Sequence, residues 1–542
     1  ETEQILANIW QELLLVERVS IHDNFFELGG HSLLATSLIF RIRQIFTIDL
    51  PLRHLFEAPT IAALNWLIEQ LRAEQILADP NNCLSREPVL SQQNHIPGTP
   101  LPLSLAQQYI WQMHQAGEPG AALNSTIAIR IRETLSPIVL EQSFNEIIRR
   151  HEVLRTVFTI VDDRPMQVVM PELHLPLFYE DLQHLPPERR ESAALSLVMN
   201  SIKRPFDLCA APLIRVSCIR FAPEEYGLFI VAHHIITDGW SLGLLISELN
   251  TLIQAFSEGK PSPLLPVDYQ YTDFALWQQQ VVSADSLTRQ LTYWQHKLVE
   301  EVDPIESNSF SSSPLSSKRA GRHVANFPNV LASAVESFCR AKGVTPFVVL
   351  LAGLKLTLAK WSGRQEILVG VTIGNRTVPG TESMLGCFIN DVILRSHLSP
   401  THNGLTLIQT LQGTLNEAID NKDVPLHQVI EQVQKLRPLT LMANITLTPS
   451  MQASGDLPSW EAIDWYEQEQ GADDHEVELC DRTTPLEFYV EISQTVRIVI
   501  HYSLEVFSSE TIQSLIASYK DLLSQLVAQP DTFLSEWVSS RF

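Results

Sequence analysis

The sequence predicts a multidomain chain in which a small all-α unit of four helices precedes a large α/β domain of two lobes. Apolar residues recur at helical spacing through residues 1–75, whereas residues 76–98 are polar, rich in Pro and Asn, and without clear period. From residue 99 onward, strand-like apolar runs alternate with amphipathic helical stretches. A stretch that long exceeds what a single core serves, so we expect two lobes, at 99–270 and 271–542.

Each helix of the first unit has its own signal. The segment "TEQILANIWQELLLV" predicts the first helix, and "SLLATSLIFRIRQIF" predicts the second, with Ser32 at its start. "PLRHLFEAP" predicts a short third helix. "TIAALNWLIEQLRAEQ" predicts the fourth, and Thr60 is expected to be its N-cap because a hydroxyl there satisfies a first-turn amide.

In the large domain, five runs predict strands: "TIAIRIR", "LIRVSCIRF", "YGLFIVAH", "EILVGVTI" and "VRIVIHY". Four stretches predict helices: "LEQSFNEIIRRHEVL", "SLGLLISELNTLIQAF", "VLASAVESFCRAKG" and "ETIQSLIASYKDLLSQLV". The acidic segment 456–481 lacks a comparable pattern, and we interpret it as a solvated loop or hairpin.

Composition limits the possible partners. The net charge is −24 over 542 residues, which argues against a nucleic-acid backbone or an anionic membrane as partner. The six cysteines are scattered without metal-ligand spacing, so we expect free buried thiols in a reducing compartment and no metal site. The N-terminus has no signal-peptide pattern and no initiating Met. We therefore expect a cytoplasmic protein, cut as a piece from a longer chain.

The string "GGHS" places Ser32 at the start of a helix. Gly29 and Gly30 permit a tight turn, and a helix N-terminus favours an anion. Two interpretations follow: Ser32 is a capping residue, or its hydroxyl carries a phosphodiester. The local string alone favours the cap.

A second motif, "VAHHIITDGWSLGLL", follows a predicted strand. Adjacent strand residues point to opposite faces, so one of His233 and His234 can face a cleft while the other packs inward. Asp238 lies on the turn, where it could pair with a cation, and Gly239 offers a backbone amide for an oxyanion. A catalytic base, a metal pair and two core histidines all remain open on this evidence.

The first unit resembles the peptidyl carrier proteins of nonribosomal peptide synthetases, through "DNFFELGGHSLLATSL". The resemblance implies that Ser32 is the attachment site of 4'-phosphopantetheine, whose thiol bears an aminoacyl or peptidyl thioester. It also implies three partners: an upstream adenylation domain, a phosphopantetheinyl transferase, and a downstream acceptor carrier protein. No nucleic acid or membrane is expected, and the chain is expected to be a monomeric fragment of a megasynthetase.

The large domain resembles condensation domains, whose HHxxxDG signature matches "HHIITDG". Further strings follow in family order: "SLAQQYIW", "RHEVLRTVF", "YTDFALW", "GNRT" and "LGCFIND". Tyr109 stands where the family usually has Arg, and Asp391 where it usually has Thr. The usual DxSRxPL segment is reduced to "LRPLTL". The resemblance implies two chloramphenicol-acetyltransferase-like lobes with a tunnel between them.

Site roles follow from the same resemblance. His234 is expected to be the catalytic base, with His233 beside it in a more structural role, and Gly239 is an oxyanion candidate. Asp238 is expected to form a buried pair with Arg376, and Arg150 is expected to give structural support. The implied reaction joins a donor thioester on the carrier to an acceptor amine. Two alternatives stay open: an epimerising or otherwise modifying domain, and a non-catalytic platform that binds the carrier.

Overall fold

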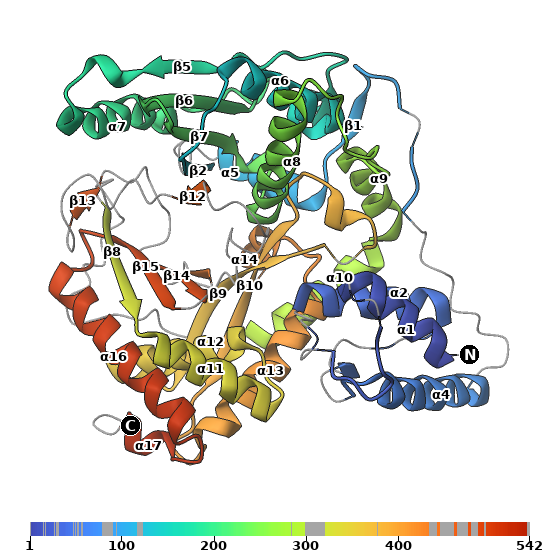
Figure 1. Ribbon diagram of the computed structural model, residues 1–542. Coiled ribbons are helices and arrows are strands. Elements are labelled where there is room, and N and C mark those ends of the chain that lie inside the picture. The colour runs from blue at the N-terminus through green and yellow to red at the C-terminus, as the bar shows by residue number, and fades with distance from the viewer. Residues whose placement is uncertain are drawn as a thin grey trace.

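The structure, a computed structural model, describes most of residues 2–78, 90–298, 320–432 and 486–538, with the short segments 442–444, 460–462 and 475–477. Figure 1 shows a small helical unit beside two larger lobes, each built on a β-sheet. The predicted combination of an all-α unit and a two-lobed α/β domain is confirmed. The lobe boundary at 270/271 stays a prediction.

The helical unit packs around one apolar core. Its described helices are α1 (Thr2–Leu14), α2 (Ser32–Phe46) and α4 (Ile61–Ala78). Trp10 of α1 is fully buried and meets the Phe25 ring edge-on, with 5.0 Å between ring centroids. The predicted cap is present, since the Thr60 hydroxyl accepts the amide hydrogen of Ala63 at 3.2 Å. Most of the predicted third helix lies outside the described residues.

The upper lobe in Figure 1 contains a five-stranded sheet in the order β12-β2-β7-β6-β5 and a three-stranded sheet in the order β1-β4-β3. Its elements are β1 (Pro100–Pro102), α5 (Leu105–Gln115), β2 (Asn124–Ile131), α6 (Pro137–Arg150), η1 (Glu152–Arg155), β3 (Thr156–Val161), β4 (Arg164–Val169), β5 (Phe178–Asp181), η2 (Leu182–His184), α7 (Pro187–Lys203), β6 (Ile214–Ala222), β7 (Glu225–His233), η3 (His234–Ile236), α8 (Gly239–Ser257) and α9 (Tyr271–Val281). Alternate side chains of β7 explain its apolar run: Leu228 and Ile230 join the cluster with α6 and α8, whereas Phe229 packs with α7.

The lower lobe contains a seven-stranded sheet in the order β10-β9-β11-β14-β15-β8-β13. Its elements, with β12 of the other sheet, are α10 (Ala284–Leu298), β8 (Ala320–Phe327), α11 (Asn329–Lys342), α12 (Pro346–Ser362), β9 (Glu366–Gly374), η4 (Thr381–Ser383), β10 (Ile389–His397), α13 (Gly404–Asp420), α14 (Leu426–Gln432), β11 (Met442–Asn444), β12 (Trp460–Ala462), β13 (His475–Val477), β14 (Leu486–Ile492), β15 (Val496–Ser503), α16 (Ser509–Ala528) and α17 (Leu534–Trp537). Helices α11, α12, α13 and α16 share one apolar cluster with the sheet.

The acidic segment 456–481 differs from its predicted interpretation. Its described residues form neither a hairpin nor only loop, because β12 pairs with β2 of the upper lobe and β13 pairs with β8 of the lower lobe. Trp460 explains the first pairing, since its side chain is buried and its indole Nε1 donates to Glu133 at 2.8 Å. The chain therefore crosses from the second half of the sequence into the sheet of the first half.

Among the described helices, no single one is long and apolar enough to cross a membrane, although α11 and α12 pass that test as a bent pair. Of the described cysteines, Cys218, Cys339 and Cys387 are buried free thiols, as predicted, whereas Cys209 is exposed.

Helix α12 buries a cation that gives a first testable prediction. The Lys355 side chain is fully buried, and Nζ donates to the Ile367 carbonyl at 3.1 Å, the Leu394 carbonyl at 2.6 Å and the Ser396 hydroxyl at 2.9 Å. Burial lowers the pKa of Lys355 to about 7. The unfolded chain therefore binds more protons than the folded chain between pH 7 and its ordinary pKa, and this residue makes stability rise with pH in that window.

We expect Lys355→Met to remove this contribution. Between pH 7 and 9.5 the free energy of unfolding of the wild type should gain on the order of 2 kcal/mol relative to the variant, as measured by urea unfolding. Taking the difference cancels the titration of the cysteines, which both proteins share. Lys360→Met, at an exposed position of the same helix, is the matched control. A pH-independent difference would contradict the prediction.

Candidate functional site

His233 ends strand β7 and His234 begins η3, and the structure separates the environments of these two histidines. His233 is fully buried, and its Nδ1 accepts the amide hydrogen of Ile235 at 3.1 Å. Burial, with smaller contributions from the neighbouring His114 and His234, lowers the pKa of His233 to about 3. His233 therefore stays neutral and packs inward against the rings of His114 and Phe206.

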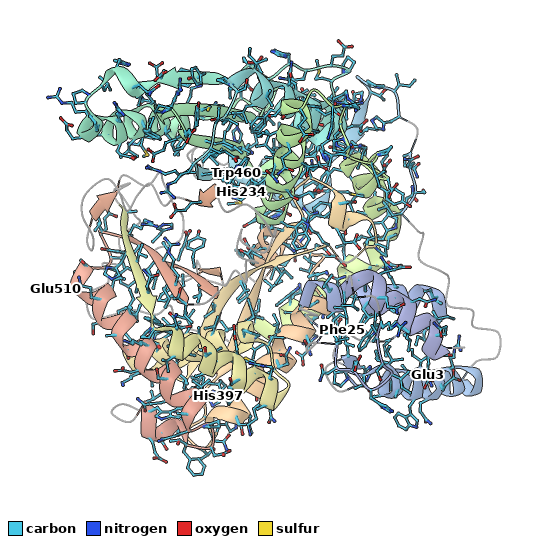
Figure 2. The ribbon with its side chains drawn as sticks, viewed as in Figure 1. Glu3, Phe25, His234, His397, Trp460 and Glu510 are labelled. Carbon is cyan, nitrogen blue, oxygen red and sulfur yellow. The ribbon has the colours of Figure 1, made fainter. Side chains whose placement is uncertain are left out.

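His234 begins η3 and is only half-buried (Figure 2). Its Nδ1 lies 3.4 Å from the Thr237 carbonyl, and its Nε2 lies 3.0 Å from the Ser125 hydroxyl. The same hydroxyl also lies 3.2 Å from Nδ1, so either ring nitrogen can carry the proton while the other is the basic nitrogen. No sequence pattern pointed to Ser125, whose position follows only from the pairing of β2 with β7. Among the described residues, no group of three or more His, Cys, Asp or Glu gathers to hold a metal ion.

A buried ion pair holds the loop that follows His234. Arg376 Nη2 lies 2.9 Å from Asp238 Oδ1 and 3.1 Å from Oδ2, and both side chains are almost completely buried. The pairing expected for these two residues is therefore present. Asp238 also caps α8 by accepting the amide hydrogen of Ser241 at 2.8 Å, and it accepts that of Phe388 at 3.1 Å. One carboxylate thus joins the loop of the upper lobe to the segment before β10.

The first turn of α8 adds further hydrogen bonds to the contact between the two lobes that Asp238 and Arg376 form. Ser241 Oγ accepts from Arg376 at 2.7 Å and donates to the Gly386 carbonyl at 2.8 Å. Trp240 Nε1 donates to the Glu382 carbonyl at 2.9 Å. Gly239 is the first residue of the helix, and a side chain there would meet open space. Its amide is one of the first-turn donors that a helix leaves unsatisfied, as an oxyanion site requires.

Arg150 lies at the other end of α8. Its guanidinium contacts both oxygens of Glu248 at 3.3 Å, and His151 Nε2 lies 2.9 Å from the same carboxylate. Because Glu248 belongs to α8, this network fixes the helix whose first turn carries the joint with Arg376. Arg150 is thereby placed to support the site without reaching it.

Three of the sequence strings meet at Tyr271. Its hydroxyl lies 2.7 Å from Ser104 Oγ of "SLAQQYIW" and donates to the Cys387 carbonyl of "LGCFIND". A Cβ on Gly386 would come within 1.9 Å of the Tyr271 ring, so glycine is required there. Strings far apart in the chain therefore form one packed joint between the lobes.

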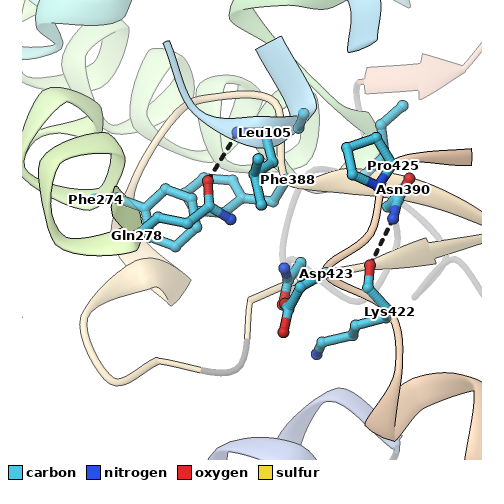
Figure 3. A pocket seen from close by; sticks show the side chains of 11 residues that line it. Leu105, Phe274, Gln278, Phe388, Asn390, Lys422, Asp423 and Pro425 are labelled. Atoms are coloured by element: carbon cyan, nitrogen blue, oxygen red, sulfur yellow. Dashed lines mark hydrogen bonds between the residues drawn. The ribbon is translucent and has the colours of Figure 1, made fainter. Parts of the chain in front are cut away.

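The helical unit lies against the lower lobe. Ile419 at the end of α13 packs on the core of the helical unit, and Arg41 Nη2 lies 3.9 Å from Glu382 Oε1. A small pocket, with room for about one water molecule, lies near this contact. Leu105 and Ala106 of α5 line one side and Lys422 and Asp423 another (Figure 3). Lys422 is buried, and burial lowers its pKa to about 8.

Helix α2 begins at Ser32, so the backbone agrees with both interpretations of this residue. The amides of the first turn of a helix favour an anion, and a phosphodiester carries that charge. His31 and the two glycines before it lie outside the described residues, as does "LRPLTL".

The fold and the site together define a class of carrier-linked domains. The large domain has two α/β lobes with an HHxxxDG loop at their junction, and in the helical unit before it helix α2 begins at Ser32. Residues 99–541 match the family model of the condensation domain, and residues 4–64 match that of the phosphopantetheine attachment site. The chain belongs to the condensation domain family and carries a phosphopantetheine attachment domain before it. The match indicates covalently attached 4'-phosphopantetheine as the cofactor.

Curated relatives are peptide synthetases. The chain is 34% identical over 539 residues to a linear gramicidin synthase of Brevibacillus parabrevis, and the match covers 98% of this chain and 10% of that protein. It is 32% identical over 434 residues to phosphinothricin tripeptide synthetase PhsB of Streptomyces viridochromogenes, covering 80% of this chain and 36% of that protein. The chain therefore spans about a tenth of the length of the gramicidin synthase protein that it matches.

Solved structures share the fold. The condensation domain from the monacolin K polyketide synthase MokA superposes with a TM-score of 0.68 at 16% identity, over 80% of this chain and 99% of that one. The X-domain from teicoplanin biosynthesis, solved in complex with OxyB, gives a TM-score of 0.67 at 18% identity, over 83% of this chain and 98% of that one. These likenesses show the fold alone.

Proposed function

We propose that this chain forms peptide bonds in nonribosomal peptide synthesis, as an acyltransferase. A pantetheine thiol on Ser32 would hold the donor residue as a thioester. The acceptor α-amine attacks the donor carbonyl, a C–N bond forms, and the C–S bond breaks. His234 accepts the proton of the attacking amine or orients it, and the amide of Gly239 faces the oxyanion.

The half-buried imidazole of His234 is the observation that carries this proposal. It sits on a loop that a buried ion pair, Asp238 with Arg376, ties to the opposite lobe. Its neighbour His233 is too buried to reach a substrate. A base at the junction of two lobes, with a carrier in the same chain, suits the joining of two tethered reactants, because positioning supplies most of such a rate enhancement.

The partners are part of the same proposal. An upstream adenylation domain would charge the carrier, a phosphopantetheinyl transferase would modify Ser32, and a downstream acceptor carrier would supply the amine. The protein would act in the cytoplasm as part of a longer synthetase.

Intact-protein mass spectrometry tests the proposal. The full chain is loaded with an aminoacyl-pantetheine group by a phosphopantetheinyl transferase and then given an acceptor aminoacyl carrier. We expect the donor mass to leave the chain and to appear as an amide on the acceptor. Ser32→Ala is the loading control and should stay unmodified. A donor mass altered in place would indicate a modifying domain, and an unchanged donor with a bound acceptor would indicate a binding platform.

A further inference from the structure

Asp391 is a carboxylate of the lobe junction that the proposed mechanism does not use. Thr372 donates its hydroxyl hydrogen to Oδ1 at 2.6 Å, and Tyr109 donates to Oδ2 at 3.3 Å. Burial raises the pKa of this carboxyl, while the two hydroxyl donors lower it. In the part of the chain that the structure describes, Asp391 has no ion pair with Lys, Arg or His, unlike Asp238.

The described residues that contact the Asp391 carboxylate carry no positive charge. Tyr109 packs on the apolar clusters of both lobes, so it lies at their junction. The His427 ring stacks on Tyr109 with 5.7 Å between centroids, and burial lowers the pKa of His427, partly opposed by Glu431. Thr372 is the register partner of Asp391, so both side chains share one face of the sheet. Asp391 is partly buried as a residue, and its carboxyl lies in low-dielectric surroundings, since burial is the largest influence on its pKa.

Two chains of contacts connect Asp391 with the carrier-side pocket and with the loop of His234. Leu105 lines the pocket, Tyr109 lies one turn further along α5, and α5 packs on η3, which begins at His234. In the second chain of contacts, the amide of Phe388 binds Asp238, and Asp391 lies three residues further, roughly 10 Å along β10. These contacts link Asp391 both to the carrier-side pocket and to the loop that follows His234.

We propose that Asp391 binds a positively charged side chain, an ammonium or a guanidinium, on the donor residue delivered by the carrier. The inference rests on the proposed function, since that function supplies the donor. A carboxylate has about four lone-pair sites, and only two are used here. An enclosed carboxylate without a cation gains most from a cationic partner, because a low local dielectric strengthens the pair. Asp391 would thus determine which donor residues are accepted.

Binding of two soluble probes to the full, unloaded chain tests this inference. The probes are Nα-acetyl-ornithyl and Nα-acetyl-norleucyl pantetheine amides, which match in length and differ in the terminal charge. We expect calorimetry to show roughly 10- to 100-fold tighter binding of the ornithyl probe by the wild type. Asp391→Asn should reduce this preference to within about twofold. Equal binding of both probes by the wild type would overturn the inference, and this result needs no variant.

Two further measurements separate this role from others. Glu431→Gln removes the same charge from an exposed position of α14 and should keep the ornithyl preference. A preference that survives in a folded Asp391→Asn protein would also overturn the inference. Transfer is measured separately, with each donor loaded on Ser32. If the ornithyl preference in binding is present but neither donor is transferred, the proposed function fails and the cation site stands.

Discussion

His234→Ala is expected to slow amide formation by about 10²- to 10⁴-fold, the usual contribution of a general base. The reason is local: His234 presents a half-buried imidazole at the lobe junction, and no described neighbour can replace it, since His233 is buried and neutral. Loading of Ser32 should be unchanged, because the carrier folds around its own apolar core. The measurement is the single-turnover rate of transfer from the loaded chain to an acceptor carrier, followed by intact mass.

His174→Ala is the matched control, since that side chain is exposed and pairs with Glu141 on the surface. It should transfer at the wild-type rate. Ser125→Ala, which removes the hydroxyl beside Nε2, should change the rate less than His234→Ala does. Wild-type turnover by His234→Ala would refute the imidazole as the essential base and would leave positioning as the whole of catalysis.

Arg376→Ala is expected to destabilise the large domain by about 3–5 kcal/mol, because it leaves the buried Asp238 carboxylate without its partner. The guanidinium also donates to the carbonyls of Thr381 and Met384, and both bonds would be lost. The free energy of unfolding and the melting temperature of the large domain measure this effect. Arg395→Ala, which breaks a more exposed pair with Glu366, is the control and should cost much less.

The pair also makes a prediction about coupling. Asp238→Asn alone should lower stability, and the double variant Asp238→Asn/Arg376→Ala should lose less than the sum of the two single losses, because neither then leaves an opposing charge buried. Additive losses would mean that the two side chains act independently. An Asp238→Asn protein of full stability but without activity would point instead to a direct chemical role for Asp238.

The spacing of apolar residues in the sequence was sufficient to predict the strand and the helix that surround the site. The apolar run "YGLFIVAH" became β7, and the amphipathic "SLGLLISELNTLIQAF" became most of α8, because each buries its apolar positions against a single neighbouring layer. The motif "VAHHIITDGWSLGLL" also predicted the turn between this strand and this helix. The sequence also predicted that one of His233 and His234 packs inward while the other can face a cleft, because neighbouring strand residues face opposite ways.

Contacts between distant segments could not be predicted from local pattern. The pairing of Asp238 with Arg376 spans 138 residues, and only the family resemblance suggested it. Nothing in the spacing pointed to Ser125 beside His234, or to Tyr109 and Thr372 around Asp391, because strand register decides these contacts. The three-residue strand at Trp460 was missed because an acidic segment without alternation gives no strand signal.

Strand β12 has a practical consequence for protein engineering. It covers the β2 edge of the upper sheet with residues that come late in the chain. An upper lobe expressed alone would expose that edge, whose unpaired backbone groups invite aggregation. The upper apolar cluster would also lose Leu385, Phe388 and Trp460. The lobes look like two exchangeable modules, but the first half of the sequence does not encode a complete upper lobe. A chimera joined between the lobes would therefore be expected to misfold unless β12 is moved with its sheet.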